Sequence, residues 1–148
     1  MATQDELKRI AAEKAVEFVP ENEYIGIGTG STINFFIEAL GKSGKKIKGA
    51  VSTSKKSSEL LAKYEIPEVS LNDVMGLAVY VDGADEVNHA LQMIKGGGGA
   101  HLNEKIVASA SDKFVCIADE SKYVSRLGKF PLPVEVVENA RSLVSRKL

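Results

Sequence analysis

The spacing of apolar residues changes repeatedly along the chain, from continuous short runs to a recurrence every three or four positions. Four runs have the length and composition of buried strands: residues 24–28, 47–51, 77–81 and 114–118. Between the runs, the spacing is that of one face of a helix. The clearest example follows Ser31, where Ile33, Phe36, Ile37 and Leu40 recur at helical spacing. The pattern therefore predicts strands that alternate with helices.

Local residues indicate where the helices begin and end. Thr3 and Glu6 form a capping-box pattern at the start of the first helix, and Pro20 stops it. The apolar residues expected to share this helix's buried face are Leu7, Ile10, Ala11 and Phe18. Further helices are predicted from Ser31 to a stop at Gly41 and Gly44, from Ser54 to Tyr64, and from Leu102 to Ala110, with a short extended piece at Glu68–Leu71.

This alternation is typical of an α/β fold with a doubly wound, mostly parallel sheet. Pro131 and Pro133 mark one linker. Beyond it the pattern predicts a short strand at Val134–Val136 and then a helix that runs to Leu148. These residues are too few for a domain, so we expect the chain to end within an element.

Composition excludes several classes of protein. The 148 residues are 44% hydrophobic and 26% charged, as in ordinary globular domains, and the net charge of −1 provides no general attraction for nucleic acid or anionic lipid. No apolar stretch is long enough to span a membrane, and the N-terminus lacks an apolar signal segment. Cys116 is the only cysteine, which excludes a disulfide framework and fits a reducing cytoplasm. The two histidines are too few for a multi-histidine zinc site.

Small polar residues follow the predicted strands. In an open parallel sheet, ligands bind outside the carboxyl ends of the strands. The segments at those ends are Thr29–Thr32, Ser52–Ser54, Asp82–Asp85 and Asp119. Hydroxyl, glycine and carboxylate groups of this kind suit a small polyol or a phosphate.

The first of these turns resembles a dinucleotide fingerprint only in part. Ser31 stands where the third glycine is needed, and the next strand ends in Ser52 rather than in an acidic residue. A Walker A loop is absent. The turn is therefore interpreted as a phosphate cradle at a helix N-terminus. The alternative is a tight turn in which glycine only permits the strand and helix to pack.

Three carboxylates, Asp82, Asp85 and Glu86, follow the most apolar strand. A close pair of carboxylates can differ in protonation and act as acid and base, or can bind sugar hydroxyls. A solvated acidic loop is the alternative. With His89 the same residues form a conceivable magnesium or manganese site.

Lys95 precedes four consecutive glycines, Gly96–Gly99. Such a run favours close approach of the backbone to a ligand, and the lysine could stabilise a developing oxyanion. Glu104 follows in the first helical turn and could project back toward this loop. The alternatives are a flexible hinge for the glycines and a capping role for Glu104. Lys122, just after a strand end, is a candidate for binding an anion, whereas Lys8 by itself has the character of solvated surface.

Taken together, these segments resemble the type A family of ribose-5-phosphate isomerases. The matching segments are residues 25–32, 80–86, 93–100, 104–106, 116–122 and 127–136. Their order and spacing agree over essentially the whole chain. One departure is Asn103, at a position that is commonly arginine in the family.

The resemblance implies interconversion of ribose 5-phosphate and ribulose 5-phosphate without a metal or another cofactor. Glu104 would be the base that moves a proton between two carbons through an enediolate. Asp82 and Asp85 would bind hydroxyls and assist ring opening, and Lys95 with the glycine N–H groups would stabilise the enediolate oxygen. The substrate-binding residues that the resemblance implies are Lys8, Thr29, Gly30, Ser31, Thr32, Gly83, Ala84, Gly96, Gly97, Gly98 and Lys122.

Family members continue beyond the equivalent of Leu148. The resemblance therefore implies a Rossmann-like catalytic domain at residues 1–130, followed at 131–148 by a linker and the beginning of an incomplete α+β domain. It also implies a cytoplasmic homodimer or higher oligomer of the pentose phosphate pathway. Two other functions are considered: a sugar-phosphate-binding module without turnover, and a related enzyme acting on an amino sugar.

Overall fold

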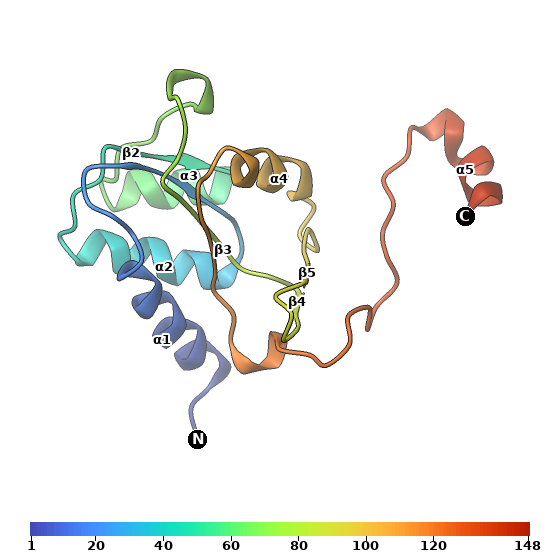
Figure 1. The fold of residues 1–148 in the computed structure, drawn as a ribbon, viewed down its shortest axis with the longest axis horizontal. Coiled ribbons are helices and arrows are strands. Elements are labelled where there is room, and N and C mark those ends of the chain that lie inside the picture. Colours follow the sequence, from blue (N-terminus) through green and yellow to red (C-terminus); the bar gives the residue numbers. More distant parts are fainter.

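The computed structural model describes residues 1–148, and strands and helices alternate along most of the chain (Figure 1). The helices are α1 (Gln4–Val16), α2 (Ser31–Lys42), α3 (Lys55–Lys63), α4 (His101–Ser109) and α5 (Arg141–Lys147). The strands are β1 (Tyr24–Ile27), β2 (Gly49–Ser52), β3 (Val79–Asp82), β4 (Glu86–Val87), β5 (Met93–Ile94) and β6 (Phe114–Cys116). Short 3-10 helices lie at Leu71–Asp73, Glu120–Lys122 and Glu138–Ala140. None of the helices has the length and apolar character needed to cross a membrane.

Four strands form one parallel sheet in the order β2-β1-β3-β6. Ile25 of β1 pairs with Ala50 on one side and with Val79 on the other, and Val81 of β3 pairs with Val115. The predicted parallel α/β sheet is confirmed. The antiparallel hairpin of β4 and β5, by contrast, lies in a segment for which the sequence pattern predicted no strand.

Helices cover both faces of the sheet. Successive side chains of β1 and β3 point to opposite faces, and nearly all of them are buried, so both faces must be covered. Ile25, Ile27 and Val81 pack with buried residues of α1, α2 and α3. Tyr80 points to the opposite face and packs in a smaller cluster with Val107 of α4. The fold is therefore doubly wound and Rossmann-like, with α4 covering the face on which Tyr80 lies.

The first helix has the predicted start but not the predicted buried face. Thr3 and Glu6 form both bonds of the capping box, and the helix ends at Val16, before Pro20. Its buried residues are Ala12, Ala15 and Val16. The predicted face was wrong at Leu7, Ile10 and Phe18, which are 37%, 59% and 52% exposed, whereas Ala11 packs against the core as predicted. Small alanines let α1 lie close against α2, a contact that a search for large apolar residues does not reveal.

The two glycines expected to end the second helix have different outcomes: the prediction is wrong for Gly41 and confirmed for Gly44. Gly41 does not end α2 but lies within it, where a Cβ atom would come within 2.7 Å of the Cβ of Tyr64. Gly44, with φ of +73°, follows the C-cap Ser43 and lies in the turn after the helix. Close packing of α2 against Tyr64 therefore explains Gly41.

The segment after Lys129 extends away from the sheet and ends in α5, which stands apart from the other helices in Figure 1. Residues 131–137 have no regular secondary structure, so the predicted strand at Val134–Val136 is wrong. An extended apolar run forms a strand only where a neighbouring strand accepts its hydrogen bonds, and here none does. Leu132, Val134 and Val137 are exposed in this segment.

Candidate active site

A polar pocket of about 280 Å³ lies at the carboxyl ends of β1 and β3. Its lining residues are Lys8, Thr29, Gly30, Ser31, Thr32, Ser54, Asp82, Gly83, Ala84, Asp85, Lys95, Gly96, Gly98, Ala100, Glu104 and Lys122. The fold thus brings together every predicted site residue except Gly97. Ser54 and Ala100 were not among the predicted site residues, although the strand-end pattern had included Ser54.

Gly97 lies behind Asp85 rather than in the pocket lining. Its N–H donates a 2.8 Å hydrogen bond to Oδ2 of Asp85. A Cβ atom at this position would lie 2.6 Å from Oδ1 of the same carboxylate. Gly97 therefore orients Asp85 and leaves its Oδ1 without a bond from the glycine loop.

Asp82 is 1% exposed, and both of its carboxylate oxygens already accept hydrogen bonds. Oδ1 accepts the N–H groups of Thr29 at 3.2 Å and Gly83 at 2.7 Å. Oδ2 accepts the ammonium of Lys95 at 2.9 Å and the hydroxyl of Tyr80. This carboxylate therefore fixes the positions of the β1–α2 turn and of Lys95.

Tyr80 is a site-supporting residue that the sequence analysis missed. Burial, followed by the negative charge of Asp82, raises the pKa of Tyr80 well above its ordinary value, so the phenol stays neutral and donates. The sequence did contain a signal for this contact. Tyr80 and Asp82 are two positions apart in one strand, so their side chains lie on the same face of the sheet.

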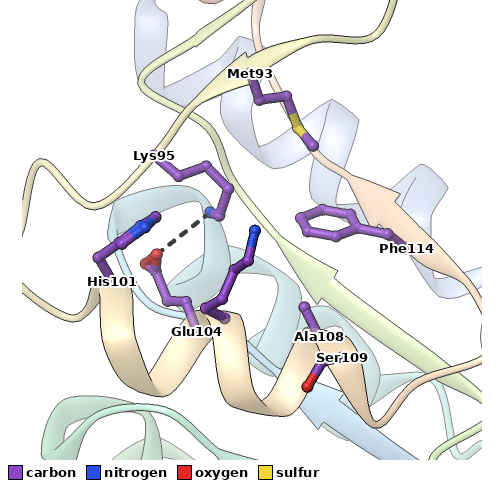
Figure 2. A pocket seen from close by; sticks show the side chains of 8 residues that line it. Met93, Lys95, His101, Glu104, Ala108, Ser109 and Phe114 are labelled. Carbon is purple, nitrogen blue, oxygen red and sulfur yellow. Dashed lines mark ion pairs between the residues drawn. The ribbon is translucent and has the colours of Figure 1, made fainter.

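Glu104 is 5% exposed, and its side chain points toward Lys95 (Figure 2). Its Oε2 lies 3.6 Å from Nζ of Lys95 and has no hydrogen-bond partner. Burial, followed by the charge of Asp82, raises the pKa of Glu104, whereas Lys95 acts in the opposite direction. Its carboxylate makes no capping bond to α4, and Ala100 is the N-cap. Glu104 is thus a poorly solvated carboxylate with a lone pair available to accept a proton.

The opposite end of the pocket carries positive charge and free backbone donors. The N-terminus of α2 opens there after Gly30, whose φ of +111° favours glycine. Lys8 of α1, whose side chain is 14% exposed, donates a 3.0 Å bond from Nζ to Oγ of Ser31. Lys122 lines the same pocket from the 3-10 helix that Asp119 caps. The interpretation of Lys8 as solvated surface was wrong, because helix packing brings it to this pocket.

The third carboxylate of the acidic motif has a separate position. Glu86 is 4% exposed and accepts the N–H groups of Gly128 at 2.8 Å and Lys129 at 3.1 Å. His89 is exposed in the turn after β4. No group of three histidine, cysteine, aspartate or glutamate side chains is arranged to hold a metal ion, so the conceivable magnesium or manganese cluster does not form. The solvated acidic loop is also wrong, because Asp82 and Glu86 are buried.

Lys95 and Glu104 also line a second hollow of about 480 Å³, which Figure 2 shows. Its other walls include Met93 of β5, Phe114 of β6 and Ala108 of α4. The Lys95–Glu104 ion pair is therefore shared by the polar pocket and by a more apolar hollow beside it.

This arrangement combines three chemical capabilities. Glu104 can accept a proton, the adjacent Lys95 can stabilise negative charge that develops on an oxygen, and the N-terminus of α2 with two lysines can hold an anion. The pocket therefore suits proton transfer within a small anionic molecule.

The sequence of this chain matches both a protein-family model and individual proteins of the same name. Residues 49–148 match the family model described as ribose 5-phosphate isomerase A (phosphoriboisomerase A). Over all 148 residues the chain is 94% identical to ribose-5-phosphate isomerase A of Neisseria meningitidis serogroup C and spans 66% of that relative's length.

The fold of this chain is also similar to solved structures of ribose 5-phosphate isomerases. The crystal structure of ribose 5 phosphate isomerase A from Neisseria gonorrhoeae has a TM-score of 0.96 and 92% identity, over 99% of this chain and 66% of that one. A D-ribose-5-phosphate isomerase in complex with phospho-erythronic acid has a TM-score of 0.92 and 39% identity, with the same coverage of both chains.

Proposed function

This chain belongs to the ribose 5-phosphate isomerase A family, and from that membership we propose that its strand-end pocket interconverts ribose 5-phosphate and ribulose 5-phosphate. The reaction moves the C2 proton of the open-chain aldose to C1, and the O2 hydroxyl proton to O1, through an enediolate. The observation that carries the proposal is the geometry of Glu104, a buried carboxylate with a raised pKa beside the ammonium of Lys95.

Glu104 is assigned the role of the base. Its ionised form removes the proton from C2 and, once protonated, returns it to C1. The lack of a hydrogen bond at Oε2 supports this role, because that oxygen has no donor to give up before it accepts the proton. Burial beside Asp82 increases the basicity of the carboxylate.

Lys95 and Asp85 are assigned to the oxygens of the substrate. Lys95, held by Asp82 and by the carbonyl of Gly83 at 2.6 Å, stabilises the enediolate oxygen, with the N–H groups of Gly96 and Gly98 nearby. Asp85 keeps Oδ1 for a sugar hydroxyl, because Gly97 occupies Oδ2. Asp82 supports the reaction by fixing Lys95, and Gly83 and Ala84 complete the wall.

The phosphate is assigned to the N-terminus of α2. Gly30, Ser31 and Thr32 begin this helix, and Lys8 and Lys122 supply positive charge. One relative was solved in complex with phospho-erythronic acid, a ligand that combines a phosphate with hydroxyl groups, and such a ligand suits a pocket with a cationic end and a carboxylate end. The dinucleotide interpretation receives no such support.

To test this proposal, the chain is incubated with ribose 5-phosphate that carries deuterium at C2. The formation of ribulose 5-phosphate and the fraction of deuterium retained in it are both measured. We expect turnover with partial loss of deuterium to solvent. Glu104→Gln is expected to lower kcat at least about 1,000-fold while it preserves binding measured by calorimetry. Glu13→Gln, on the exposed surface of α1, is the matched control. Saturable binding without turnover in the unmodified chain would contradict the isomerase proposal and favour a binding module.

The family membership also supports broader proposals. We place the reaction in the non-oxidative pentose phosphate pathway of the cytoplasm and expect a homodimer. Residues 1–130 would form the catalytic domain, and 131–148 would be a linker and the first part of a second domain. Size-exclusion chromatography with light scattering tests the dimer, and limited proteolysis near residue 131 tests the boundary.

A further inference from the structure

A chain of hydroxyl groups runs beneath the β1–α2 turn. Oγ1 of Thr29 lies 2.9 Å from Oγ of Ser54, which lies 3.0 Å from Oγ of Ser57, and Ser57 in turn lies 2.7 Å from the carbonyl oxygen of Gly28. Ser57 is 1% exposed, so no solvent replaces these partners at the buried end.

The direction of every bond in this chain is fixed by its last member. A carbonyl oxygen can only accept, so the single hydroxyl proton of Ser57 must point to Gly28. Ser57 therefore accepts from Ser54, and Ser54, whose proton is then committed, must accept from Thr29. Ser54 also accepts the N–H of Ser57 at 3.2 Å, which fills its remaining capacity.

Thr29 consequently has no donor left for a ligand. Its hydroxyl proton is committed to Ser54, and its N–H donates to Oδ1 of Asp82 at 3.2 Å. The side chain still lines the pocket, where its oxygen presents only lone pairs. A phosphate dianion offers acceptors alone and gains nothing from such a group.

We propose that Thr29 accepts a hydrogen bond from a sugar hydroxyl and takes no part in binding the phosphate. This inference rests on the proposed function and divides the 29–32 turn into two parts. Ser31 and Thr32, at the start of α2, face the phosphate together with Lys8. Thr29, tied to Asp82, faces the hydroxyl-bearing carbons between the phosphate and the reacting end. Thr29 is thus a specificity-determining residue that favours a hydroxylated carbon chain.

The test compares affinity for ribose 5-phosphate with affinity for inorganic phosphate, which measures the phosphate subsite alone. Thr29→Val keeps the shape of the side chain and removes its oxygen. We expect it to weaken ribose 5-phosphate binding about 3- to 10-fold while phosphate inhibition changes less than about twofold. Thr29→Ser should restore the affinity for the sugar. Ser31→Ala should weaken binding of both ligands by similar factors.

A second variant tests the hydroxyl chain from outside the pocket. Ser57→Ala removes the acceptor of the Ser54 proton, so Ser54 can donate to Thr29 instead, and the Thr29 proton can then point into the pocket. We expect weaker ribose 5-phosphate binding with phosphate binding unchanged. Parallel loss of both ligands in Thr29→Val, or no loss of either, would overturn the assignment. An unmodified chain that neither binds nor converts ribose 5-phosphate would instead overturn the proposed function itself, and with it this inference.

Discussion

The Nζ atom of Lys95 lies 3.6 Å from Oε2 of Glu104, near enough for an ion pair but beyond hydrogen-bond length. The ammonium directs its short bonds elsewhere, to Asp82 at 2.9 Å and to the carbonyl of Gly83 at 2.6 Å. Glu104 is therefore close to the positive charge of Lys95, but its Oε2 accepts no hydrogen bond from the ammonium. That separation leads directly to the first three predictions.

Activity should depend on a carboxyl group that titrates above the ordinary value of 4.5 for glutamate, because the pKa of Glu104 is raised by burial and by Asp82. The base must be ionised. We therefore expect kcat/KM to fall as pH decreases through that raised pKa, at a higher pH than an exposed glutamate would give. A pH profile of the initial rate checks this expectation. The expectation would be contradicted if the acid limb of this profile had its midpoint at or below pH 4.5, the ordinary pKa of glutamate.

Glu104→Gln should make the folded chain more stable near neutral pH while it removes activity. In the unmodified chain the raised pKa means that the ionised, buried carboxylate destabilises the folded state at neutral pH. The free energy of unfolding therefore rises as the pH falls through that pKa toward 4.5. We expect a gain of about 1 kcal/mol in the free energy of unfolding near neutral pH. Urea denaturation checks the gain. It should shrink in acid, and a variant that is less stable at neutral pH would contradict the prediction.

Replacement of Lys95 by methionine should lower kcat about 100- to 1,000-fold, since the developing oxyanion loses its cation. The same change leaves Asp82 and Glu104 as neighbouring buried carboxylates, so the acid limb of the pH profile should also move upward. Steady-state kinetics at several pH values measures both effects. Lys113→Met, at an exposed position before β6, is the control. An unchanged kcat in the Lys95 variant would contradict the proposed role.

Gly28→Ala should damage both stability and activity, because its Cβ would lie 1.9 Å from Cγ of Asp82. The strand or the carboxylate must move, and we expect a loss of about 1–3 kcal/mol in the free energy of unfolding. Gly76→Ala is the matched control, since its nearest contact would be the carbonyl of Ala110 at 3.6 Å. Equal thermal stabilities of the two variants would show that Asp82 does not depend on this close approach.

Much of the fold was predictable from the sequence because it depends on local periodicity. The apolar run at residues 77–81 and the helical spacing after Ser31 each depend on residues a few positions apart, and the structure places both in the sheet and its covering helices. Parallel order followed from the alternation of elements. The gathering of polar residues at the pocket then followed from the rule that strand ends share one edge.

The remainder depends on tertiary contacts that local patterns do not encode. Lys8 reaches Ser31 only because α1 packs on α2 through alanines, and nothing beside Lys8 in the sequence indicates that packing. The strands of the β4–β5 hairpin are two residues each, too short to show a period. Glu86 resembled its neighbours Asp82 and Asp85 in type but binds the backbone of Gly128 and Lys129.

The parallel sheet also has a consequence for how the pocket forms during folding. The lining residues extend from Lys8 to Lys122, and β3 must pair with β1 and β6 before these ends share an edge. Such pairings join distant parts of the chain, and loops must close before they form, so they are expected to form late. No segment shorter than residues 8–122 contains every lining residue. If the proposed binding of ribose 5-phosphate is followed during refolding, its appearance would therefore report completion of the whole sheet.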